Sequence, residues 1–311
     1  MTRTLGWRDR AAILRMAAPL RLARRALEPG ASAIAASPGE TVENWLIRNG
    51  QTARLRELLW DPLALAALNQ PPDCAAAPAF ARVLAEMFGT DARAAAIGLP
   101  IKPLHEMYAA PARAYIERRG GQVRTGAAAT LTTDDDRIVS VAAGGDTWTA
   151  PAVIAAVPWF RLPGLFDRLP AGLAATLARA RAMESSPIVT VNLWFDRPVL
   201  DEPFVGLPGR TMQWVFDKRA AFGETASHLS LVSSGADEML RRTNEELLAL
   251  AHAELLDAMP AIRAARLVRG TVVREPRATF SLAPGQPARP STETPVRGLW
   301  LAGDWIDTVS G

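Results

Sequence analysis

The spacing of apolar residues changes its period several times along this chain, and that feature constrains the fold most. Between 41 and 118, apolar residues recur at helical intervals separated by Pro and Gly, whereas from Gly120 onward they alternate with a period of two. Helix, sheet, helix and strand patterns then follow in turn. Such an order is neither a regular alternation of strand and helix nor a block of strands followed by helices. The sequence therefore predicts two domains that share the chain in alternating segments, which suits its 311 residues.

Individual helices and strands are expected where this periodicity runs between Gly, Pro or Asp breaks. The expected helices are 7–27, 42–48, 53–68, 78–88, 103–118, 162–182 and 237–259. The expected strands are 123–125, 129–132, 138–142, 147–149, 152–157, 188–195, 211–216, 229–232, 267–274 and 299–301. Because 188–195, 211–216 and 229–232 are rich in β-branched and aromatic residues, they predict an antiparallel sheet with one buried face.

The first helix is amphipathic. Its apolar stripe consists of Ile13, Met16, Leu20, Ala23 and Leu27, and its opposite side carries Arg8, Arg15, Arg21 and Arg25. One interpretation is a helix lying on a membrane surface, and the other is a helix packed on its own domain with a solvated arginine face. Packing is favoured because membrane-surface helices usually carry larger apolar residues than Ala and Met.

The net charge of +3 does not indicate a nucleic-acid partner. Positive charge is concentrated in residues 1–28, which hold seven arginines against Asp9 and Glu28. The only lysines are Lys102 and Lys218, so the chain lacks the lysine-rich patterning of a phosphate-binding surface. We expect no nucleic-acid binding.

No membrane span or secretory signal is expected. The longest uncharged apolar stretch, 147–160, is shorter than the ~18–20 residues that a span needs and contains Pro151 and Pro158. Arginines interrupt every candidate apolar core near the start of the chain. A cytoplasmic protein is therefore expected.

Several kinds of reaction centre are excluded by the residues present. A single cysteine, Cys74, excludes a disulfide framework and any cysteine-based zinc or iron–sulfur site within one chain. His105, His228 and His252 are too far apart in sequence to form a chelating pair, so no metal is expected. A Ser-His-Asp triad would lack the G-x-S-x-G elbow, and neither a P-loop nor a G-x-G-x-x-G fingerprint occurs.

The C-terminal region contains the most informative motif. An apolar strand at 299–301 runs into Gly303 and Asp304, which offer close backbone approach and a carboxylate that accepts hydrogen bonds from sugar-type hydroxyls. A plain strand-to-loop turn is an equally good interpretation of this motif alone. Two further segments support a ligand: the apolar strand that ends in Val157 and Pro158, and the helix end at 119–123 that turns into a strand.

These three segments, in this order, resemble the flavin-containing amine oxidase and phytoene desaturase superfamily. Within it, the chain is most similar to the squalene-associated FAD-dependent desaturases, the hydroxysqualene dehydroxylases of hopanoid synthesis. The segments that carry the resemblance are 68–72, 98–100, 103–104 with Tyr108, 111–115, 186–198, 209–216 and 301–305. Gly303-Asp304 is specific only to the superfamily, whereas 186–191 and 209–214 point to the narrower family.

The resemblance implies an α/β (α+β) fold of the two-domain FAD/NAD(P)-binding oxidoreductase type. An incomplete nucleotide-binding domain would accompany a substrate domain with an antiparallel sheet and helices. The implied segments are a helical substrate-domain part at 1–118, an FAD-binding part at 119–160, the substrate-domain sheet at 161–265 and a truncated return to the FAD-binding domain at 266–311.

The resemblance also implies roles for particular residues. Val123 would meet the adenosine half of FAD through its backbone, Ala156, Val157 and Pro158 would line the nucleotide edge, and Gly303 and Asp304 would lie along the pyrophosphate and ribitol. An ordinary role in a core strand is an equal alternative for Val123 and Val157. Candidate substrate-pocket residues are Trp194, Phe195, Trp214 and Phe216, although alternation lets only some of them face a pocket and core packing is the alternative for each. No catalytic residue is identified.

The implied function is FAD-dependent reductive dehydroxylation of hydroxysqualene to squalene, with an isoprenoid as substrate and peripheral contact with the inner face of a membrane. Family members begin with a βαβ unit carrying the dinucleotide fingerprint and continue past the Gly-Asp-Trp segment, whereas this sequence opens in helices and stops at Gly311. With both ends lacking, FAD binding by this chain is expected to be weak or absent. Two alternatives stay open: another isoprenoid or carotenoid desaturase or amine oxidase of the superfamily, and an inactive remnant or lipid-binding module.

Overall fold

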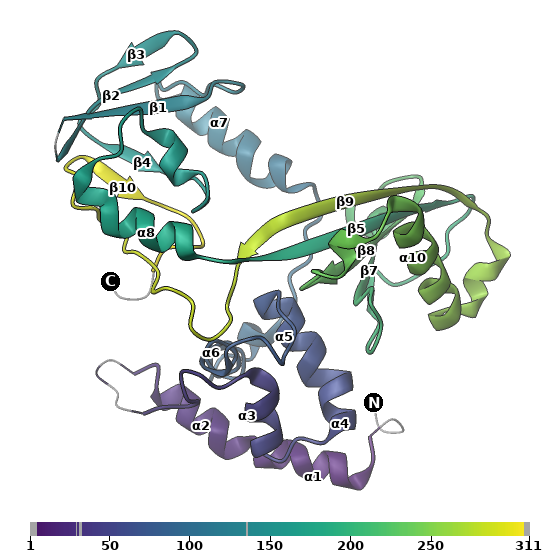
Figure 1. Cartoon of the computed structure of the whole chain (residues 1–311). Helices are drawn as coiled ribbons and strands as arrows, with labels where there is room; N and C mark the ends of the chain where they lie inside the picture. The colour runs from purple at the N-terminus through teal and green to yellow at the C-terminus, as the bar shows by residue number, and fades with distance from the viewer. Residues whose placement is uncertain (1–4, 29, 31–32, 135, 308–311) are drawn as a thin grey trace. The chain divides into compact units, whose positions relative to one another are not determined.

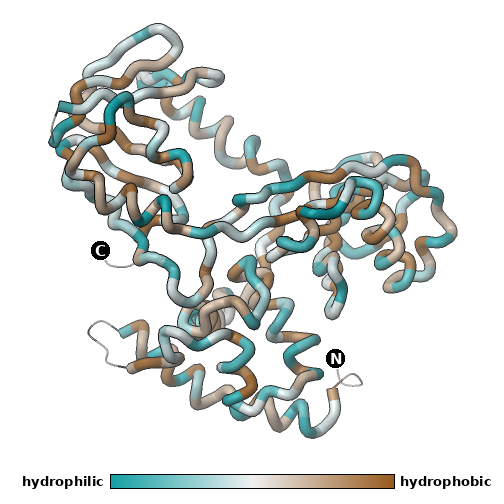
Figure 2. The backbone as a smooth tube through the Cα atoms, in the orientation of Figure 1, coloured by the Kyte–Doolittle hydropathy of each residue, from teal (hydrophilic) through white to brown (hydrophobic). Residues whose placement is uncertain are grey.

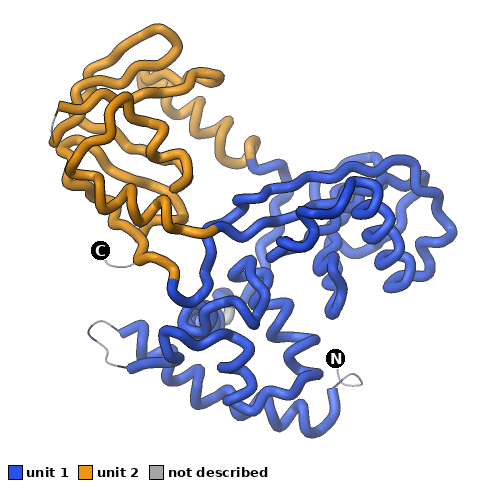
Figure 3. The backbone as a smooth tube through the Cα atoms, viewed as in Figure 1, with its two compact units in different colours: residues 1–104, 185–285 blue, residues 105–184, 286–311 orange. Residues whose placement is uncertain are grey.

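A computed structural model of the chain describes residues 5–28, 30, 33–134 and 136–307. The chain forms two compact units, shown in Figure 3. The larger unit comprises residues 1–104 and 185–285, and the smaller unit comprises 105–184 and 286–311. The chain therefore changes unit after Leu104, Glu184 and Gly285, whereas the sequence analysis places its segment boundaries after 118, 160 and 265. The assignment of these segments to cofactor and substrate domains stays a prediction.

The larger unit begins with a group of helices around an apolar core, drawn from purple to blue in Figure 1. The helices are α1 (Trp7–Arg15), α2 (Ala17–Arg25), α3 (Val42–Arg48), α4 (Ala53–Leu55), a π-helical turn η1 (Arg56–Trp60), α5 (Asp61–Leu68), α6 (Ala77–Met87) and a 3₁₀ turn η2 (Ala92–Ala95). Trp45, Leu55, Phe80 and Leu84 are fully buried in this core. The helices predicted at 42–48 and 53–68 are confirmed, and the second contains a π-helical turn that its periodicity did not indicate.

The helix predicted at 7–27 is interrupted at Met16, where α1 ends and α2 begins. Four of the five stripe residues pack within the larger unit, because Met16 and Ala23 are buried in the helical core and Ile13 and Leu20 pack against it, whereas Leu27 is exposed. The interpretation as a helix packed on its own domain is therefore confirmed. Trp7 and Leu14 lie outside this contact, and each is 76% exposed.

The second part of the larger unit is a five-stranded antiparallel sheet in the order β6-β7-β8-β5-β9. Its strands are β5 (Ser185–Phe195), β6 (Phe204–Gly206), β7 (Trp214–Asp217), β8 (Ser227–Ser234) and β9 (Leu267–Phe280). The helical segments beside them are α9 (Lys218–Phe222), η6 (Met239–Arg241), α10 (Asn244–Ala258) and η7 (Pro260–Ala264). Strand β6 was not expected from the sequence.

One face of this sheet is buried against α10 (Figure 1). Val189, Val191 and Leu193 alternate along β5 with half-buried residues and pack with Leu247 and Leu255 of α10. In Figure 2 the hydropathy likewise changes from residue to residue along these strands. The predicted antiparallel sheet with one buried face is confirmed.

Asn69 joins the helices to the sheet within the larger unit. It ends α5 in the left-handed conformation, with φ 51°. Its amide nitrogen donates to the carbonyl of Ser186 at 3.1 Å and to Thr279 Oγ1 at 3.0 Å, and its Oδ1 accepts from the backbone N–H of Gly235 at 2.9 Å. A buried amide with these partners fixes how the end of α5 meets the sheet.

The smaller unit contains a three-stranded antiparallel sheet, a parallel strand pair and helices, shown in orange in Figure 3. Its strands are β1 (Ala129–Asp134), β2 (Arg137–Ala143), β3 (Asp146–Trp148), β4 (Val153–Ala155) and β10 (Leu299–Leu301). Its helical segments are η3 (His105–Ala109), α7 (Ala110–Glu117), η4 (Leu162–Leu165), η5 (Ala171–Leu173) and α8 (Ala174–Ala182). Leu131 and Leu301 are almost fully buried.

Two elements predicted in the smaller unit are wrong. Residues 123–125 form no strand, because no described segment pairs with them and the carbonyl of Val123 instead accepts a hydrogen bond from Arg113 Nη2. Residues 162–182 are not one helix, since Pro163 and Pro170 leave only the short turns η4 and η5 before α8.

Among the helices of the described ranges, none combines the length and the apolar character needed to cross a membrane.

Candidate functional site

The parallel pair β4 and β10 brings together two segments that are distant in sequence. Val153 pairs with Leu299 and Ala155 with Leu301, so both strands end at the same edge. Beyond that edge the backbone N–H of Ala302 donates to the carbonyl of Ala155 at 3.2 Å. Open α/β sheets bind ligands at the carboxyl ends of their parallel strands. Five of the six predicted cofactor residues lie in these two segments: Ala156, Val157, Pro158, Gly303 and Asp304.

Gly303 is required by the backbone at this edge. Its φ is +140°, a conformation that side chains rarely permit, and a Cβ there would lie 3.1 Å from Cδ1 and Nε1 of Trp305. The Trp305 ring is fully buried, and its Nε1–H donates to the carbonyl of Val157 at 2.9 Å. The glycine therefore allows the chain to turn over a buried indole that ties both segments together.

Asp304 is exposed beside this buried indole. Within the described part of the chain, no other side chain or backbone N–H hydrogen-bonds or pairs with its carboxylate. An ionised carboxylate offers two oxygens that only accept hydrogen bonds. Asp304 is thus positioned to accept hydrogen bonds from a ligand at the edge of the parallel pair.

Val123 lies in a different segment, between α7 and β1. It is half-buried, and its carbonyl accepts a hydrogen bond from Arg113 Nη2 of α7 at 3.2 Å. The alternative of a core-strand role for Val123 is wrong, because no strand forms there. Its contact with a nucleotide stays a prediction.

The sheet of the larger unit separates the predicted substrate-pocket residues onto two faces. Strand pairing of Asn192 with Ser230 and of Ser230 with Phe216 places Trp194, Trp214 and Phe216 on one face. Phe195 lies on the other face, is 5% exposed within the core, and has its ring centroid 6.1 Å from that of His252 on α10. Phe195 therefore packs in the core, which was the alternative role stated for each of these residues. Trp194, Trp214 and Phe216 lie on the face away from α10.

That second face carries a group of rings, which we call the aromatic face: Trp194, Phe204, Trp214, Phe216 and His228. The Phe204 ring centroid lies 5.9 Å from that of Trp214 and 6.0 Å from that of Phe216. The Trp194 ring stacks on His228 at 4.2 Å, with the Arg269 guanidinium 4.5 Å from its centroid. The Phe204, Trp214 and Phe216 rings form a half-buried apolar surface suited to a hydrocarbon chain, whereas the Trp194 ring contacts the polar groups of His228 and Arg269.

Sequence reasoning missed Phe204 and His228. Phe204 belongs to a three-residue strand, too short to give a period-two pattern. His228 stands opposite Trp194 in the β5–β8 pairing, and its Nε2 lies 3.0 Å from Asn192 Oδ1. Pairing β5 with β8 in this register would have identified His228 as a neighbour of Trp194.

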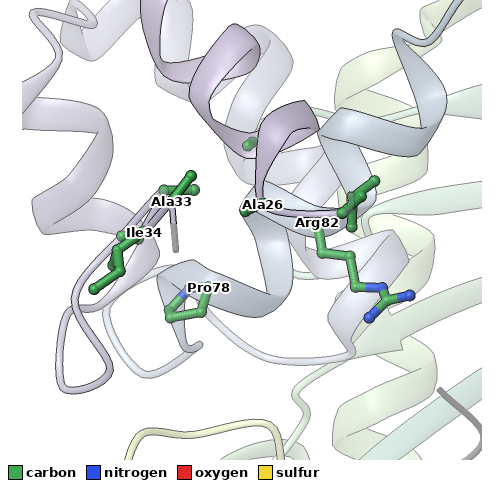
Figure 4. Close-up of a pocket in the computed structure, with 9 residues that line it drawn as sticks. Ala26, Ala33, Ile34, Pro78 and Arg82 are labelled. Atoms are coloured by element: carbon green, nitrogen blue, oxygen red, sulfur yellow. The ribbon is translucent and has the colours of Figure 1, made fainter. Parts of the chain in front are cut away.

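A cavity of about 260 Å³ lies between α2 and α6 (Figure 4). Its wall is formed mainly by small and aliphatic side chains, including Ala26, Ile34 and Pro78. The one charged wall residue, Arg82, already donates to Glu86 at 3.1 Å. No polar group of this wall requires a ligand, so we do not place the functional site here.

The resemblance noted above implies a flavin nucleotide, and the edge of the β4–β10 pair suits one. Such a ligand carries hydroxyl groups that need acceptors, and a pyrophosphate that needs close approach to backbone. Asp304 provides an acceptor without a partner among the described residues, and Gly303 positions it by letting the chain turn over the Trp305 ring, which fills the space where a Cβ would lie. These residues fit the hydroxyl-bearing part of a flavin nucleotide.

Solved structures share this fold at low sequence identity. An oxidoreductase from Methanosarcina mazei superimposes with a TM-score of 0.74 at 17% identity, over 99% of this chain and 70% of that chain. Putrescine oxidase bound to putrescine gives a TM-score of 0.68 at 17% identity, over 96% of this chain and 70% of that chain. The predicted two-domain oxidoreductase fold is confirmed.

Sequence relatives include two hydroxysqualene dehydroxylases. The protein of Sinorhizobium fredii is 30% identical over 278 residues, covering 88% of this chain and 61% of that protein. The protein of Rhodopseudomonas palustris is 31% identical over 260 residues, covering 82% of this chain and 58% of that protein. A 15-cis-phytoene desaturase of an Oncidium hybrid cultivar is 26% identical over 299 residues, covering 90% of this chain and 50% of that protein. The chain thus spans between half and about three-fifths of the length of these curated relatives.

The sequence profile described as "Flavin containing amine oxidoreductase" matches residues 3–310 of this chain. This match, together with the two hydroxysqualene dehydroxylases, confirms the resemblance drawn from the sequence. The chain belongs to the flavin-containing amine oxidoreductase family.

Proposed function

We propose that this chain is part of an FAD-dependent oxidoreductase that removes the hydroxyl group of hydroxysqualene to give squalene. The observation that carries the proposal is the 30–31% identity to hydroxysqualene dehydroxylases over 82–88% of the chain. The resembling segment 186–198 includes most of β5, where Trp194 contributes to the aromatic face. Sequence similarity and the chemistry of that face therefore both favour an isoprenoid substrate.

In this proposal the aromatic face holds the hydrocarbon chain of the substrate. Burial of apolar surface contributes about 25 cal/mol per Å², so a long isoprenoid gains affinity without polar contacts. Loss of hydroxide from an allylic carbon leaves positive charge, and a desolvated aromatic face stabilises a cation by up to ~2 kcal/mol. Trp194, Trp214 and Phe216 would bind the chain, exclude water and stabilise this charge.

The smaller unit would hold the cofactor at the ends of β4 and β10. Asp304 would accept hydrogen bonds from cofactor hydroxyls, and Gly303 would let the chain turn over Trp305 and keep Asp304 exposed at this edge. Flavin, when bound, supplies hydride transfer. The proposal names FAD as the flavin form, and chromatography of the cofactor released from the purified protein tests that choice.

A second candidate is the desaturation of a carotenoid precursor. It is supported by the 26% identity to a 15-cis-phytoene desaturase over 90% of this chain. The two candidates differ in their products, because one removes a hydroxyl and the other introduces a double bond.

Product analysis separates these candidates. The protein, expressed from its complete gene and supplied with FAD and a reductant, should convert hydroxysqualene to squalene in gas chromatography with mass detection. Conversion of 15-cis-phytoene with an oxidised electron acceptor, and no loss of hydroxysqualene, would establish the second candidate instead. A Trp194→Ala and Phe216→Ala double variant should lose turnover while remaining folded.

A further inference from the structure

A second cavity of the larger unit, with a volume of about 350 Å³, lies between the η1–α5 segment and the β6–β7 connection. Small-molecule pockets commonly fall in the range of ~300–1,000 Å³. Its apolar wall is formed by Leu58, Pro62, Leu65, Pro72, Leu207 and Pro208. The polar residues on this wall determine what kind of molecule it accepts.

Most polar side chains on this wall already have partners. Glu57 pairs with Arg54 at 3.1 Å, and Arg210 pairs with Asp257 at 2.7 Å. The Gln213 amide bonds to Ser234 in both directions, because its Oε1 accepts from the backbone N–H at 2.7 Å and its Nε2 donates to the carbonyl at 3.3 Å. These groups are satisfied by the protein itself.

Asp61 and Trp214 differ from their neighbours on the wall. Asp61 Oδ1 and Trp214 Nε1 are both buried, and across the described ranges neither atom has a hydrogen-bond partner. Buried polar atoms without a partner are rare because each costs about 1–3 kcal/mol of desolvation. Two such atoms on residues of one cavity wall, one an acceptor and the other a donor, indicate a ligand that pairs with both.

The backbone on both sides of this cavity lets η1 and the β6–β7 connection come close to each other. Asp61 follows the π-helical turn η1, a feature often found at functional sites, and its N–H bonds to the carbonyl of Arg56. On the other side Gly209 has a φ of +73°, and a Cβ there would lie 3.3 Å from Glu57 Oε1. The glycine thus allows the β6–β7 connection to approach η1.

We propose that this cavity binds the hydroxyl group of an apolar alcohol, which accepts a hydrogen bond from Trp214 Nε1–H and donates one to Asp61 Oδ1. A hydroxyl is the smallest group that both accepts and donates, and the apolar wall suits the carbon chain attached to it. Recognition of the hydroxyl follows from the cavity alone, whereas the choice of an isoprenoid chain rests on the proposed function.

The environment of Asp61 agrees with a neutral ligand. Burial raises the pKa of its carboxyl, and Arg56 opposes this effect while Glu43, Asp73 and Glu57 add to it. A carboxyl that retains its proton to higher pH is suited to a neutral hydroxyl rather than to a cation. Trp214 also belongs to the aromatic face, so the cavity and that face share one residue.

Isothermal titration of the full chain tests the proposal with three probes of ten carbons. Geraniol is an isoprenoid alcohol, 1-decanol is a straight-chain alcohol, and myrcene is an isoprenoid hydrocarbon. We expect geraniol to bind at least 10-fold more tightly than myrcene. Trp214→Phe keeps a ring without its N–H, and Asp61→Leu keeps a similar volume without the carboxyl. Each should raise the Kd of geraniol about 3- to 10-fold, and should raise it by a larger factor than the Kd of myrcene.

The matched controls are Trp148→Phe and Asp201→Leu, which change the same residue types away from the cavity and should leave all three Kd values unchanged. Equal binding of geraniol and myrcene, or an unchanged geraniol Kd in a folded Trp214→Phe protein, would overturn the proposal. Equal binding of 1-decanol and geraniol supports the hydroxyl site and removes the isoprenoid assignment. Absent dehydroxylase activity with intact geraniol binding would contradict only the proposed function.

Discussion

The indole N–H of Trp305 donates to the carbonyl of Val157 at 2.9 Å, and this bond joins the segment that follows β10 to the segment that follows β4. The two residues are 148 positions apart in sequence. The Trp305 ring is also fully buried, so one side chain fills the core and sets the spacing of the proposed cofactor edge.

Trp305→Phe should therefore destabilise the protein. The substitution removes the hydrogen bond, leaves the Val157 carbonyl without that donor and opens a small cavity, which together cost about 2–3 kcal/mol. Chemical denaturation monitored by circular dichroism measures the change. Trp148→Phe, at a residue 37% exposed, is the matched control and should change stability by less than about 0.5 kcal/mol. Equal stability of the two variants would contradict the prediction.

Asp304→Asn should weaken flavin binding without weakening the fold. The carboxylate is exposed and has no partner within the described ranges, so its replacement removes no hydrogen bond of the folded chain. Hydrogen bonds to a charged group contribute about 1.5–3 kcal/mol, so the Kd for FAD should rise at least about 10-fold. Quenching of flavin fluorescence measures the Kd, with Asp201→Asn as control. An unchanged Kd would remove Asp304 from the cofactor site.

Phe195 and Phe216 should respond differently to the same substitution. Phe195 is packed in the core beneath α10, so Phe195→Ala should cost about 3–5 kcal/mol of stability. Phe216 is half-buried on the aromatic face, so Phe216→Ala should cost less and should instead weaken the binding of squalene. Denaturation and equilibrium binding are compared for both variants. Loss of squalene binding only in Phe195→Ala would reverse the assignment of the two faces.

The sequence predicted the elements whose pattern is local. The alternation along 188–195 located β5 and its buried face, and the helical spacing of 42–48 located α3. Residues 123–125 alternate like a strand, yet no described segment pairs with them. Periodicity reports burial along one segment and not whether a partner strand is present.

The candidate sites depended on pairings between distant segments. Ala156–Pro158 and Gly303–Asp304 could be grouped only through the family resemblance, because the parallel register of β4 and β10 that joins them is not local. Asp61 gave no sequence signal, and the sequence predicted Trp214 only as a candidate substrate-pocket residue and not as a hydrogen-bond donor to a cavity. Their shared property is a missing hydrogen-bond partner, and that property exists only once the chain has folded.

The arginine side of α1 and α2 predicts binding to anionic membranes, as the proposed oily substrate requires. Trp7 and Leu14 remain exposed on α1, and Arg21, Arg24 and Arg25 are exposed on α2. Basic residues contribute roughly 1 kcal/mol each near an anionic surface. Arg21→Gln with Arg25→Gln should therefore lower co-sedimentation with phosphatidylserine vesicles about 30-fold. Arg118→Gln with Arg168→Gln is the control, and equal binding of the unmodified chain to neutral and anionic vesicles would exclude this role.

Asp61 should make stability depend on pH in a way that Asp61→Asn abolishes. Burial raises the pKa of the folded-state carboxyl above its value in the unfolded chain, so the folded state binds the proton more tightly. Between these two pKa values the unfolded chain loses its proton first, and the stability due to this group falls as pH rises. Above the folded-state pKa the loss is complete and constant.

The asparagine variant has no proton to lose at this position, so its stability relative to the unmodified protein should increase from the ordinary pKa of an aspartate upward and then level off. Urea denaturation of both proteins from pH 4 to pH 8 measures this difference, and the remaining carboxyl groups cancel because both proteins share them. Asp201→Asn, at an exposed aspartate of the same unit, is the matched control. A difference between Asp61→Asn and the unmodified protein that stays constant, or decreases as pH rises, would mean that burial does not control the protonation of Asp61.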